Sequence, residues 1–314
     1  MAGSQERTLR RRIRTIQSTK KITRAMELIA ASQIVRAQNR IAAAAPYHKA
    51  ISQVADEVAI ELGGHAGRFM GAVDDPRRVL VLALVADRGL CGGYNANVLR
   101  AVERTVRSPQ AAETEYRIVT SGKKAPPYLR YRGIHAEQSF TGMSDRPTFE
   151  DARSIALAVR APFTDEVVDQ VLVVSTRFLS AGTQVVETRQ VLPIPVGHGS
   201  DADADDDQSE DARRTQGPAA GIRGYTEFEP DGLDILQELV ARYVEAAVFQ
   251  AMLEAAASEH TARQRAMAAA TENADELTKT LTRVMNRARQ DSITTEIMEI
   301  VGGAEALREA PEEE

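Results

Sequence analysis

The sequence predicts a long antiparallel coiled coil, formed by helices at the two ends of the chain, with a small Rossmann-like α/β domain inserted between them. Three observations predict this fold class. Towards the C-terminus, no proline lies between Pro230 and Pro311. From Gln5 to Leu62 the chain has one interior proline, Pro46, and no glycine. Between these regions, apolar strand patterns alternate with helical patterns, which is typical of a largely parallel sheet.

The C-terminal helix is expected to cover residues 229–303, with a tail at residues 304–314. Its apolar side chains recur at alternating steps of three and four, which indicates a coiled-coil seam. The seam positions are Met267, Ala270, Ala274, Leu277, Leu281, Val284 and Ala288. At ~1.5 Å per residue this helix is on the order of 100 Å long, so it needs support along its length. This three-four spacing of apolar residues stops after Ala288 and starts again in a new phase at Ile293.

The N-terminal helix is expected to cover residues 1–62, with a bend near Pro46. In its first half the seam falls on the polar residues Lys20, Thr23 and Glu27. Apolar residues spread around most of the circumference there: Ile22, Ala25, Met26, Leu28, Ile29, Ala30 and Ala31. A helix that is apolar on several sides needs apolar neighbours on more than one side.

The α/β domain is expected to cover residues 77–196, after a glycine-rich linker. The predicted strands cover residues 79–85, 116–120 and 171–175, and a fourth segment that ends at Pro193. The predicted helices cover residues 96–106 and 148–159, and a short segment that follows Gly122. Residues 197–224 are expected to form a mobile acidic loop, because this stretch is rich in aspartate and poor in large apolar residues.

Charge and cysteine content narrow the function classes. The formal net charge is −6, yet ten of the first forty residues are Arg or Lys, and acids concentrate in residues 201–211. The single cysteine, Cys91, excludes an internal disulfide and favours a cytosolic setting. The N-terminus does not resemble a signal peptide, and no stretch reaches the ~20 apolar residues of a membrane span. Any membrane association is therefore expected to be peripheral.

Self-contained catalytic chemistry is not predicted. The glycine turn at residues 89–93 follows a strand and precedes a helix, but it fits neither dinucleotide nor phosphate-loop spacing. In the look-alike SGKK at residues 121–124, Arg117 occupies the position that needs glycine. The five histidines lie in unrelated segments without ligand spacing. We therefore expect no catalytic, cofactor-binding or metal-binding residues. The basic first helix lacks a nucleic-acid recognition fold or aromatic platform, so nucleic-acid binding is not expected either.

Three separated segments resemble one known family. These are STKKITRAMELIAAS (residues 18–32), DRGLCGGYNANV (residues 87–98) and NRARQDSITTEIMEIVGGAEAL (residues 286–307), with residues 258–278 extending the match. The segments closely resemble the gamma subunit of the F-type ATP synthase, in the same order and over nearly the whole chain. The stretch from His198 to Gly221 is longer than the short acidic connection usual in that family.

The resemblance implies a rotor rather than an enzyme. In this family the two terminal helices pair as a shaft inside a ring of alpha and beta subunits, where ATP chemistry takes place on beta. The α/β domain forms a foot with the epsilon subunit on the membrane ring of c subunits. No cofactor and no direct membrane insertion are implied. The implied location is the cytoplasmic face of the bacterial plasma membrane.

The resemblance also implies roles for particular residues. Two groups would contact the alpha/beta ring: Lys20, Arg24 and Met26 at the first helix, and Arg289, Gln290 and Thr294 at the phase break. The foot would contact epsilon and the c ring through Arg88, Gly89, Gly92, Asn95 and Tyr225.

Other interpretations of the same residues remain open. Met26 could pack against the other helix, the phase break could simply face solvent, and the foot residues could serve internal packing. At the level of the whole chain, the alternatives are a coiled-coil scaffold with an inserted α/β domain and, less favoured, a nucleotide-using α/β enzyme with helical appendages.

Overall fold

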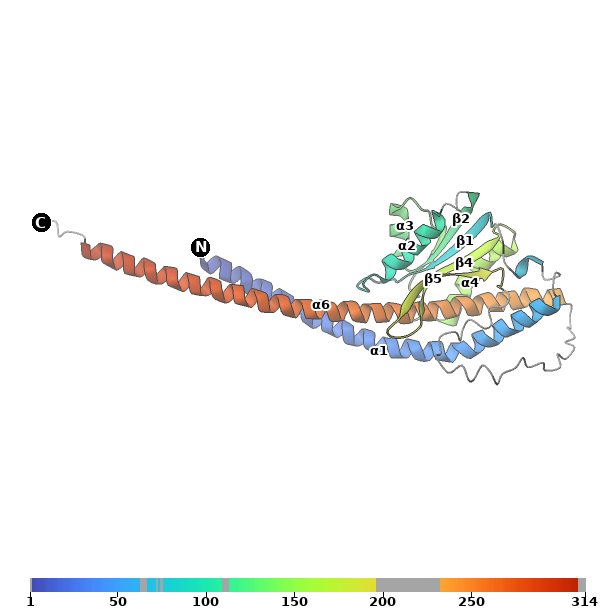
Figure 1. The fold of residues 1–314 in the computed structure, drawn as a ribbon, viewed down its shortest axis with the longest axis horizontal. Helices are drawn as coiled ribbons and strands as arrows, with labels where there is room; N and C mark the ends of the chain where they lie inside the picture. Colours follow the sequence, from blue (N-terminus) through green and yellow to red (C-terminus); the bar gives the residue numbers. More distant parts are fainter. Residues whose placement is uncertain are drawn as a thin grey trace, which may run out of the picture. The chain divides into compact units, whose positions relative to one another are not determined.

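The computed structural model describes residues 2–62, 67–71, 73, 76–108, 113–195 and 232–309 (Figure 1). The predicted acidic loop at residues 197–224, and Tyr225 with it, lies outside the described residues.

The helices and strands follow the predicted order, with one addition. They are α1 (Ala2–Leu62), β1 (Arg78–Leu84), α2 (Tyr94–Val106), β2 (Glu115–Ser121), α3 (Ala125–Tyr131), β3 (Gln138–Phe140), α4 (Phe149–Thr164), β4 (Gln170–Phe178), β5 (Gln184–Leu192) and α6 (Gly232–Glu309). The addition is β3, which is three residues long and too short to leave a periodic pattern in the sequence. The expectation of a mixed α/β fold with a long C-terminal helix is confirmed.

Both terminal helices are long. Helix α1 has 61 residues and contains Pro46 in its interior, whereas α6 has 78 residues and continues through Gly302 and Gly303.

The chain divides into two compact units. One comprises Met1–Ser32 and Arg263–Glu314, and the other comprises Gln33–Ala262. Within the described ranges, no helix is long and apolar enough to cross a membrane.

The sheet has five strands in the order β3-β2-β1-β4-β5. Strand β1 pairs in parallel with both β2 and β4, and β2 pairs in parallel with β3. Strand β5 is antiparallel to β4. The chain between these two strands covers only residues 179–183, which suffices for a hairpin but not for the crossover that a parallel pair needs.

The core of the Gln33–Ala262 unit lies on both faces of β1. Successive side chains of a strand point to opposite faces, so Leu80 and Leu82 join one cluster and Val79 and Val81 join the other. The first cluster contains residues of α4, α1 and α6, among them Ile155, Val159, Phe163, Ala55, Val58, Leu236 and Val244. The second contains residues of α2 and α3, among them Val98, Leu99, Val102 and Leu129. Each fully buried Leu, Ile, Val or Phe contributes about 1.5–3 kcal/mol.

Helix α4 begins at a capping box, a local signal that the sequence carries. The Thr148 hydroxyl accepts a hydrogen bond from the Asp151 backbone N–H at 3.2 Å, and the Asp151 carboxylate accepts one from the Thr148 N–H at 2.8 Å. Two N–H groups at the start of the helix are thereby satisfied, which fixes where α4 starts.

Candidate functional site: partner-facing surfaces

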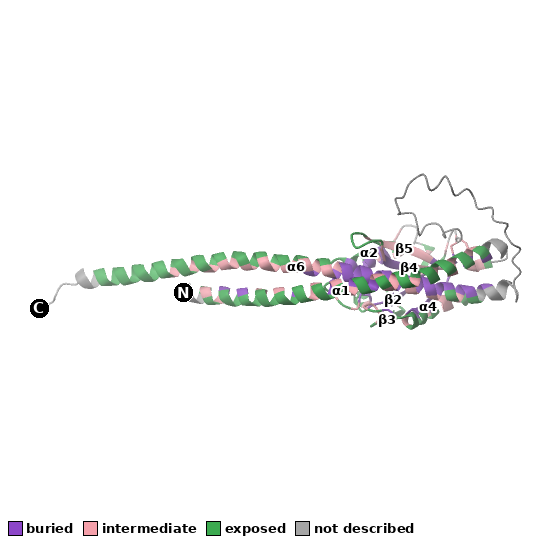
Figure 2. Cartoon of the chain, turned by 90° about the horizontal axis from the view of Figure 1, so that it is seen from below, coloured by how far each residue is buried: buried purple, intermediate pink, exposed green. Residues whose placement is uncertain are grey.

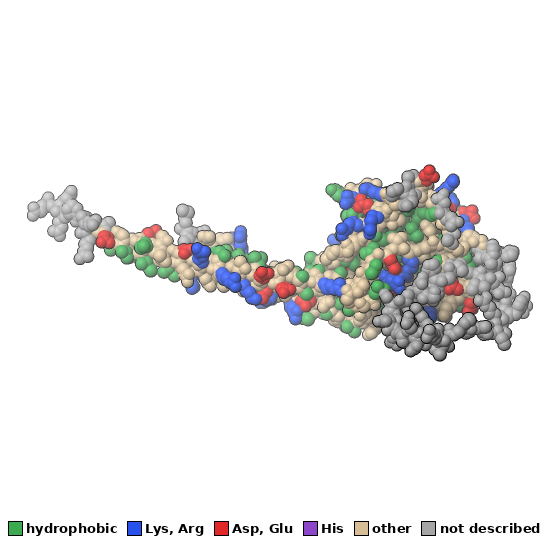
Figure 3. All heavy atoms as spheres, viewed as in Figure 1, with side chains coloured by type: hydrophobic (Ala, Val, Ile, Leu, Met, Phe, Trp, Pro, Cys, Tyr) green, Lys and Arg blue, Asp and Glu red, His purple; other side chains and the backbone are tan. Residues whose placement is uncertain are grey.

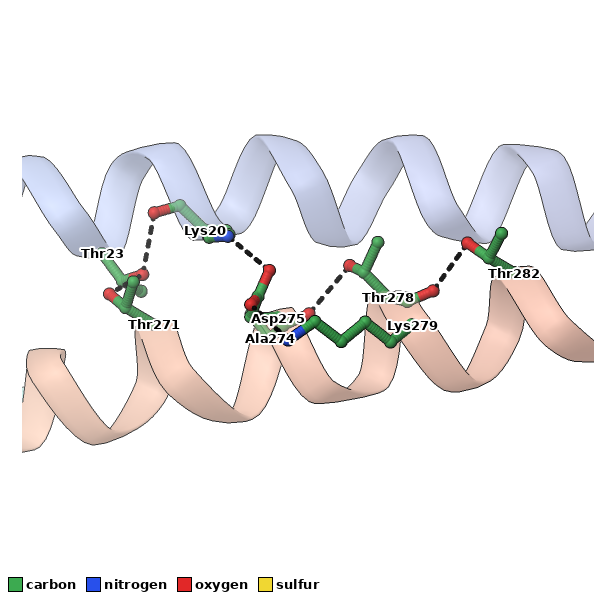
Figure 4. Close-up of polar contacts among 8 residues, drawn as sticks. All are labelled: Lys20, Thr23, Thr271, Ala274, Asp275, Thr278, Lys279 and Thr282. Carbon is green, nitrogen blue, oxygen red and sulfur yellow. Dashed lines mark hydrogen bonds and ion pairs between the residues drawn. The ribbon is translucent and has the colours of Figure 1, made fainter.

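The polar seam positions of α1 are covered within the unit of Met1–Ser32 and Arg263–Glu314 (Figure 4). Thr23 is only 9% exposed, and its hydroxyl lies 2.8 Å from the Thr271 hydroxyl. The Lys20 Nζ donates to Asp275 Oδ1 at 2.5 Å, and Lys279 reaches the other oxygen of Asp275 at 3.2 Å. The hydrogen bond from Lys20, followed by that from Lys279, lowers the pKa of Asp275. The Lys20 side chain therefore forms an ion pair within the chain.

The covered stripe of α6 differs from the predicted seam. Met267 is buried and Ala274, Leu281 and Ala288 are half-buried as expected, but Leu277 and Val284 are 48% and 45% exposed. Ala270 is half-buried as expected, and the other half-buried positions of this stretch include Thr271, Thr278 and Met285. The prediction that Leu277 and Val284 lie in the seam was therefore wrong.

The physical reason lies in the threonine hydroxyls. Each donates to a carbonyl four residues earlier in α6. Thr271 donates to the Met267 carbonyl at 2.8 Å. Thr278 donates to the Ala274 carbonyl, also at 2.8 Å (Figure 4). A hydroxyl that is satisfied within its own helix no longer needs water, so the threonine methyl can occupy a packing position. A search for apolar residues alone passes over such positions.

Apolar side chains are also exposed on α1, beside the covered stripe. Ile22 is 58% exposed and Ile29 is 61% exposed, at positions i and i+7, and Met26 beside them is half-buried. Leu28 is also exposed. Arg24 is exposed and forms an ion pair with Glu27 at 2.7 Å, one turn along the helix. Of the predicted contact residues in α1, Arg24 and Met26 are thus available to another molecule, next to an apolar row.

The C-terminal part of α6 is exposed on nearly all sides (Figure 2). Arg289, Gln290 and Thr294 are exposed, and among the described residues none of the three has a hydrogen-bond or ion-pair partner. Large apolar side chains follow with exposed fractions from 49% to 72%: Ile293, Ile297, Met298, Ile300 and Val301. Figure 3 shows hydrophobic side chains reaching the surface along this part of the helix. An apolar surface of this extent is typical of a protein contact site.

In the α/β domain, the glycine turn after β1 is held together by Asn95. Its Oδ1 accepts a hydrogen bond from the Ala86 N–H at 2.8 Å, and its Nδ2 donates to Cys91 Sγ at 3.2 Å. Cys91 is buried beneath the turn, whereas Leu90 is 62% exposed at φ 63°. Arg88 and Gly92 are exposed and Gly89 is half-buried. The turn therefore presents Arg88 and Leu90 outward, while Asn95 serves internal structure.

Asp87 connects this turn to two other loops, a role that sequence reasoning missed. Its carboxylate accepts hydrogen bonds from the backbone N–H groups of Lys123 at 3.1 Å, Gly142 at 2.8 Å and Ser144 at 3.2 Å. Burial raises the pKa of Asp87, but these backbone donors together outweigh burial and hold the pKa below its usual value. The loops after β1, β2 and β3 are thus joined at one carboxylate. The position of Asp87 directly after a buried strand was the available signal.

Gly122 of the SGKK segment is explained by close backbone packing. Its φ is +109°, and a Cβ added there would lie 2.1 Å from the Val85 carbonyl oxygen. The glycine lets the chain after β2 pass beside the end of β1, where the Val85 N–H donates to the Ser121 carbonyl at 2.8 Å.

Within the described residues, no group of three or more His, Cys, Asp or Glu side chains could hold a metal ion.

The fold and these surfaces define a class of protein: a helical subunit that acts by contacting other chains along the exposed faces of two long helices. Comparison with known proteins identifies the family. The family model described as ATP synthase matches residues 5–307. The chain is 42% identical over 311 residues to the ATP synthase gamma chain of Parafrankia sp., covering 98% of this chain and 99% of the relative. It is 43% identical over 321 residues to that of Frankia casuarinae, with the same coverage. The chain therefore belongs to the ATP synthase gamma-chain family.

Solved structures show the same fold. A chain in the cryo-EM structure of Euglena gracilis mitochondrial ATP synthase matches with a TM-score of 0.64 at 18% identity, covering 99% of both chains. A chain of the Tetrahymena thermophila enzyme, in its central stalk and c-ring structure, matches with a TM-score of 0.57 at 21% identity, covering 79% of this chain and 99% of that one.

Proposed function

We propose that this chain is the central rotor shaft of a proton-translocating F-type ATP synthase, coupling rotation of the membrane c ring to ATP synthesis at the beta subunits. The observation that carries the proposal is the exposed apolar end of α6, from Ile293 to Val301. Such a helix end needs cover from other chains, and a ring of alpha and beta subunits would provide it on all sides. Membership of the gamma-chain family supports the same assignment.

The shaft itself is proposed to be an antiparallel coiled coil of α1 and α6. Two contacts support this pairing, Lys20 with Asp275 and Thr23 with Thr271. Lys20 precedes Thr23 in α1, whereas Asp275 follows Thr271 in α6, so the two helices run in opposite directions at this point. Leu9 and Ile13 of α1 are each 8% exposed and continue the covered face towards the N-terminus.

Two surfaces are proposed to contact the alpha/beta ring. The first comprises Arg24 and Met26 with the neighbouring Ile22 and Ile29, and would meet the moving part of the beta subunits. Lys20 would act there through its ion pair with Asp275, which fixes the α1 surface, rather than by direct contact. The second surface comprises Arg289, Gln290 and Thr294, where the arginine fork suits a carboxylate or a carbonyl group of a ring loop.

The α/β domain of residues 77–196 is proposed as the foot that meets the epsilon subunit and the c ring. The exposed Arg88 and Gly92, with the half-buried Gly89 between them, would make these contacts. Asn95 would support the turn from within, and Tyr225 remains a predicted contact outside the described residues. As part of such a complex, the chain would lie at the cytoplasmic face of the bacterial plasma membrane as a peripheral component.

The proposed ring contact can be tested with Met26→Lys. A lysine at this half-buried position would place an uncompensated charge in an apolar contact, so we expect proton pumping per ATP hydrolysed to fall roughly twofold or more. The measurement is ATP-driven acidification of inverted membrane vesicles, with ATP hydrolysis assayed on the same preparation. Gln17→Lys is the matched control, because it adds the same charge at an exposed polar position of α1. Equal pumping ratios for the two variants would argue against the contact at Met26.

A further inference from the structure

A cavity of about 420 Å³ lies inside the Gln33–Ala262 unit. Helix α1, helix α6, strands β4 and β5 and the segment after β5 form its walls. Its volume falls within the range of about 300–1,000 Å³ that is usual for small-molecule sites. Neither the rotor proposal nor the family assignment gives this cavity a role.

Among the described residues, three polar atoms of the cavity walls are buried and have no hydrogen-bond partner: His48 Nδ1, Gln250 Oε1 and Glu254 Oε2. Gln250 and Glu254 are each only 8% exposed, and they lie one turn apart on α6. The amide of Gln250 donates to the other oxygen of Glu254 at 2.8 Å, which leaves one oxygen of each side chain unused. A buried polar atom that lacks a hydrogen-bond partner destabilises the fold, so these atoms point to a missing hydrogen-bond donor.

All three atoms can accept a hydrogen bond when His48 is neutral and Glu254 is ionised. Burial, and then the nearby Arg189 charge, lowers the pKa of His48, so its ring is neutral near pH 7 and one nitrogen can accept. Burial raises the pKa of Glu254, although Arg189 opposes this effect. A ligand that carries positive charge would favour the ionised form of Glu254.

The two arginines of the cavity are directed mainly towards Glu187. Arg189 forms a hydrogen-bonded ion pair with Glu187 and lies 3.9 Å from Glu254 Oε2, which is beyond hydrogen-bond distance. Arg177 is 3.9 Å from the second oxygen of Glu187. Within the part of the chain that the structure describes, the walls hold three carboxylates, those of Asp56, Glu187 and Glu254, and two guanidinium groups. This balance favours a cationic ligand over an anionic one.

We propose that this cavity binds an aliphatic diamine or polyamine. A primary ammonium group carries three N–H donors, which matches the three acceptors His48, Gln250 and Glu254. The methylene chain would lie along the apolar part of the wall, formed by Ile194, Pro195 and the ring of Tyr243. The second ammonium group would lie towards Asp56, which faces the same cavity from α1.

The test is isothermal titration of the purified full-length chain with 1,4-diaminobutane and with spermidine at pH 8. Glu254→Gln keeps the side-chain shape but removes the charge, so we expect affinity to fall about 10- to 100-fold, the usual worth of a charged hydrogen bond. Glu245→Gln is the matched control, because Glu245 is also a largely buried acid of α6 but does not line the cavity. We expect that variant to bind like the parent chain.

Two further measurements separate the amine site from general cation attraction. Affinity is expected to fall as pH decreases, because Glu254 becomes neutral and His48 becomes charged. The other titratable and charged side chains that face the cavity are those of Asp56, Glu187, Tyr243, Arg177 and Arg189. Glu254→Gln should reduce this pH dependence, and butylamine should bind more weakly than the diamine. Absence of binding at pH 8, equal affinity for Mg²⁺, or equal affinity of Glu254→Gln and Glu245→Gln would each overturn the proposal.

Discussion

Gly122 provides a direct test of how the α/β domain is built at the carboxyl ends of its strands. The residue has φ +109°, and an added Cβ would lie 2.1 Å from the Val85 oxygen, 2.6 Å from the Val85 carbonyl carbon and 2.9 Å from the Val85 Cγ2. Real Cβ atoms do not approach backbone atoms this closely, so Gly122→Ala must displace the end of β1. Val85 is 2% exposed and belongs to the core, which leaves little room for such a shift.

The expected cost has two parts. Placing alanine at a positive φ costs about 1–2 kcal/mol, and the backbone clash adds to this, so we expect a total of about 3–5 kcal/mol. For a unit of this size, each kcal/mol lowers the melting temperature by roughly 2–4 °C. Gly133→Ala is the matched control, because Gly133 also has a positive φ, +73°, but a Cβ there would meet nothing within 4 Å. Gly133 ends α3, with its N–H donating to the Arg130 carbonyl at 3.0 Å, and its substitution should cost only the conformational part.

The assay is thermal unfolding of both variants by circular dichroism, combined with amide hydrogen exchange of the β1 and β2 segments. We expect faster exchange in these strands for Gly122→Ala and little change for Gly133→Ala. Equal stability of the two variants to within about 1 kcal/mol would show that the close approach of Gly122 to Val85 does not limit stability.

Two further predictions concern polar contacts. The pKa of Asp169 is lowered from 3.8, and the hydrogen bond from Arg78 is the largest cause. The ionised carboxylate therefore stabilises the fold at pH values above 3.8. This stabilisation is lost as the pH falls through the lowered pKa. Asp169→Asn should therefore flatten the fall in stability between about pH 5 and pH 3, whereas the exposed Asp165→Asn should retain it; parallel curves for both variants would contradict the assignment. In the long helices, a double-mutant cycle of Thr23→Val and Thr271→Val should give a coupling of about 0.5–1.5 kcal/mol in urea unfolding. A cycle of Thr278→Val and Thr282→Val, whose hydroxyls bond to carbonyls of α6, is the control, and a coupling near zero for the first pair would exclude the contact between the two hydroxyls.

The sequence by itself determined the kinds of element and their order. The long helices follow from long runs with few helix-breaking residues, and the strands from short apolar runs. These signals are local, so they can be read without knowing which residues meet. The motifs at residues 18–32, 87–98 and 286–307 were also sufficient to indicate the family, because side-chain identity at fixed spacing needs no structure.

Only the tertiary structure decided which residues meet across long sequence separations. The covered stripe of α6 includes Thr271 and Thr278, whereas Leu277 and Val284 are exposed. Thr271 contacts Thr23, which lies 248 residues earlier in the chain. No local sequence pattern encodes a pairing over that separation. Asp87 acquires its role through backbone N–H groups that lie 36 to 57 residues further along the chain. The cavity around Glu254 likewise needs α1, β5 and α6 to come together. Hydrogen bonds and burial between distant segments depend on packing, which a pattern of neighbouring residues does not specify.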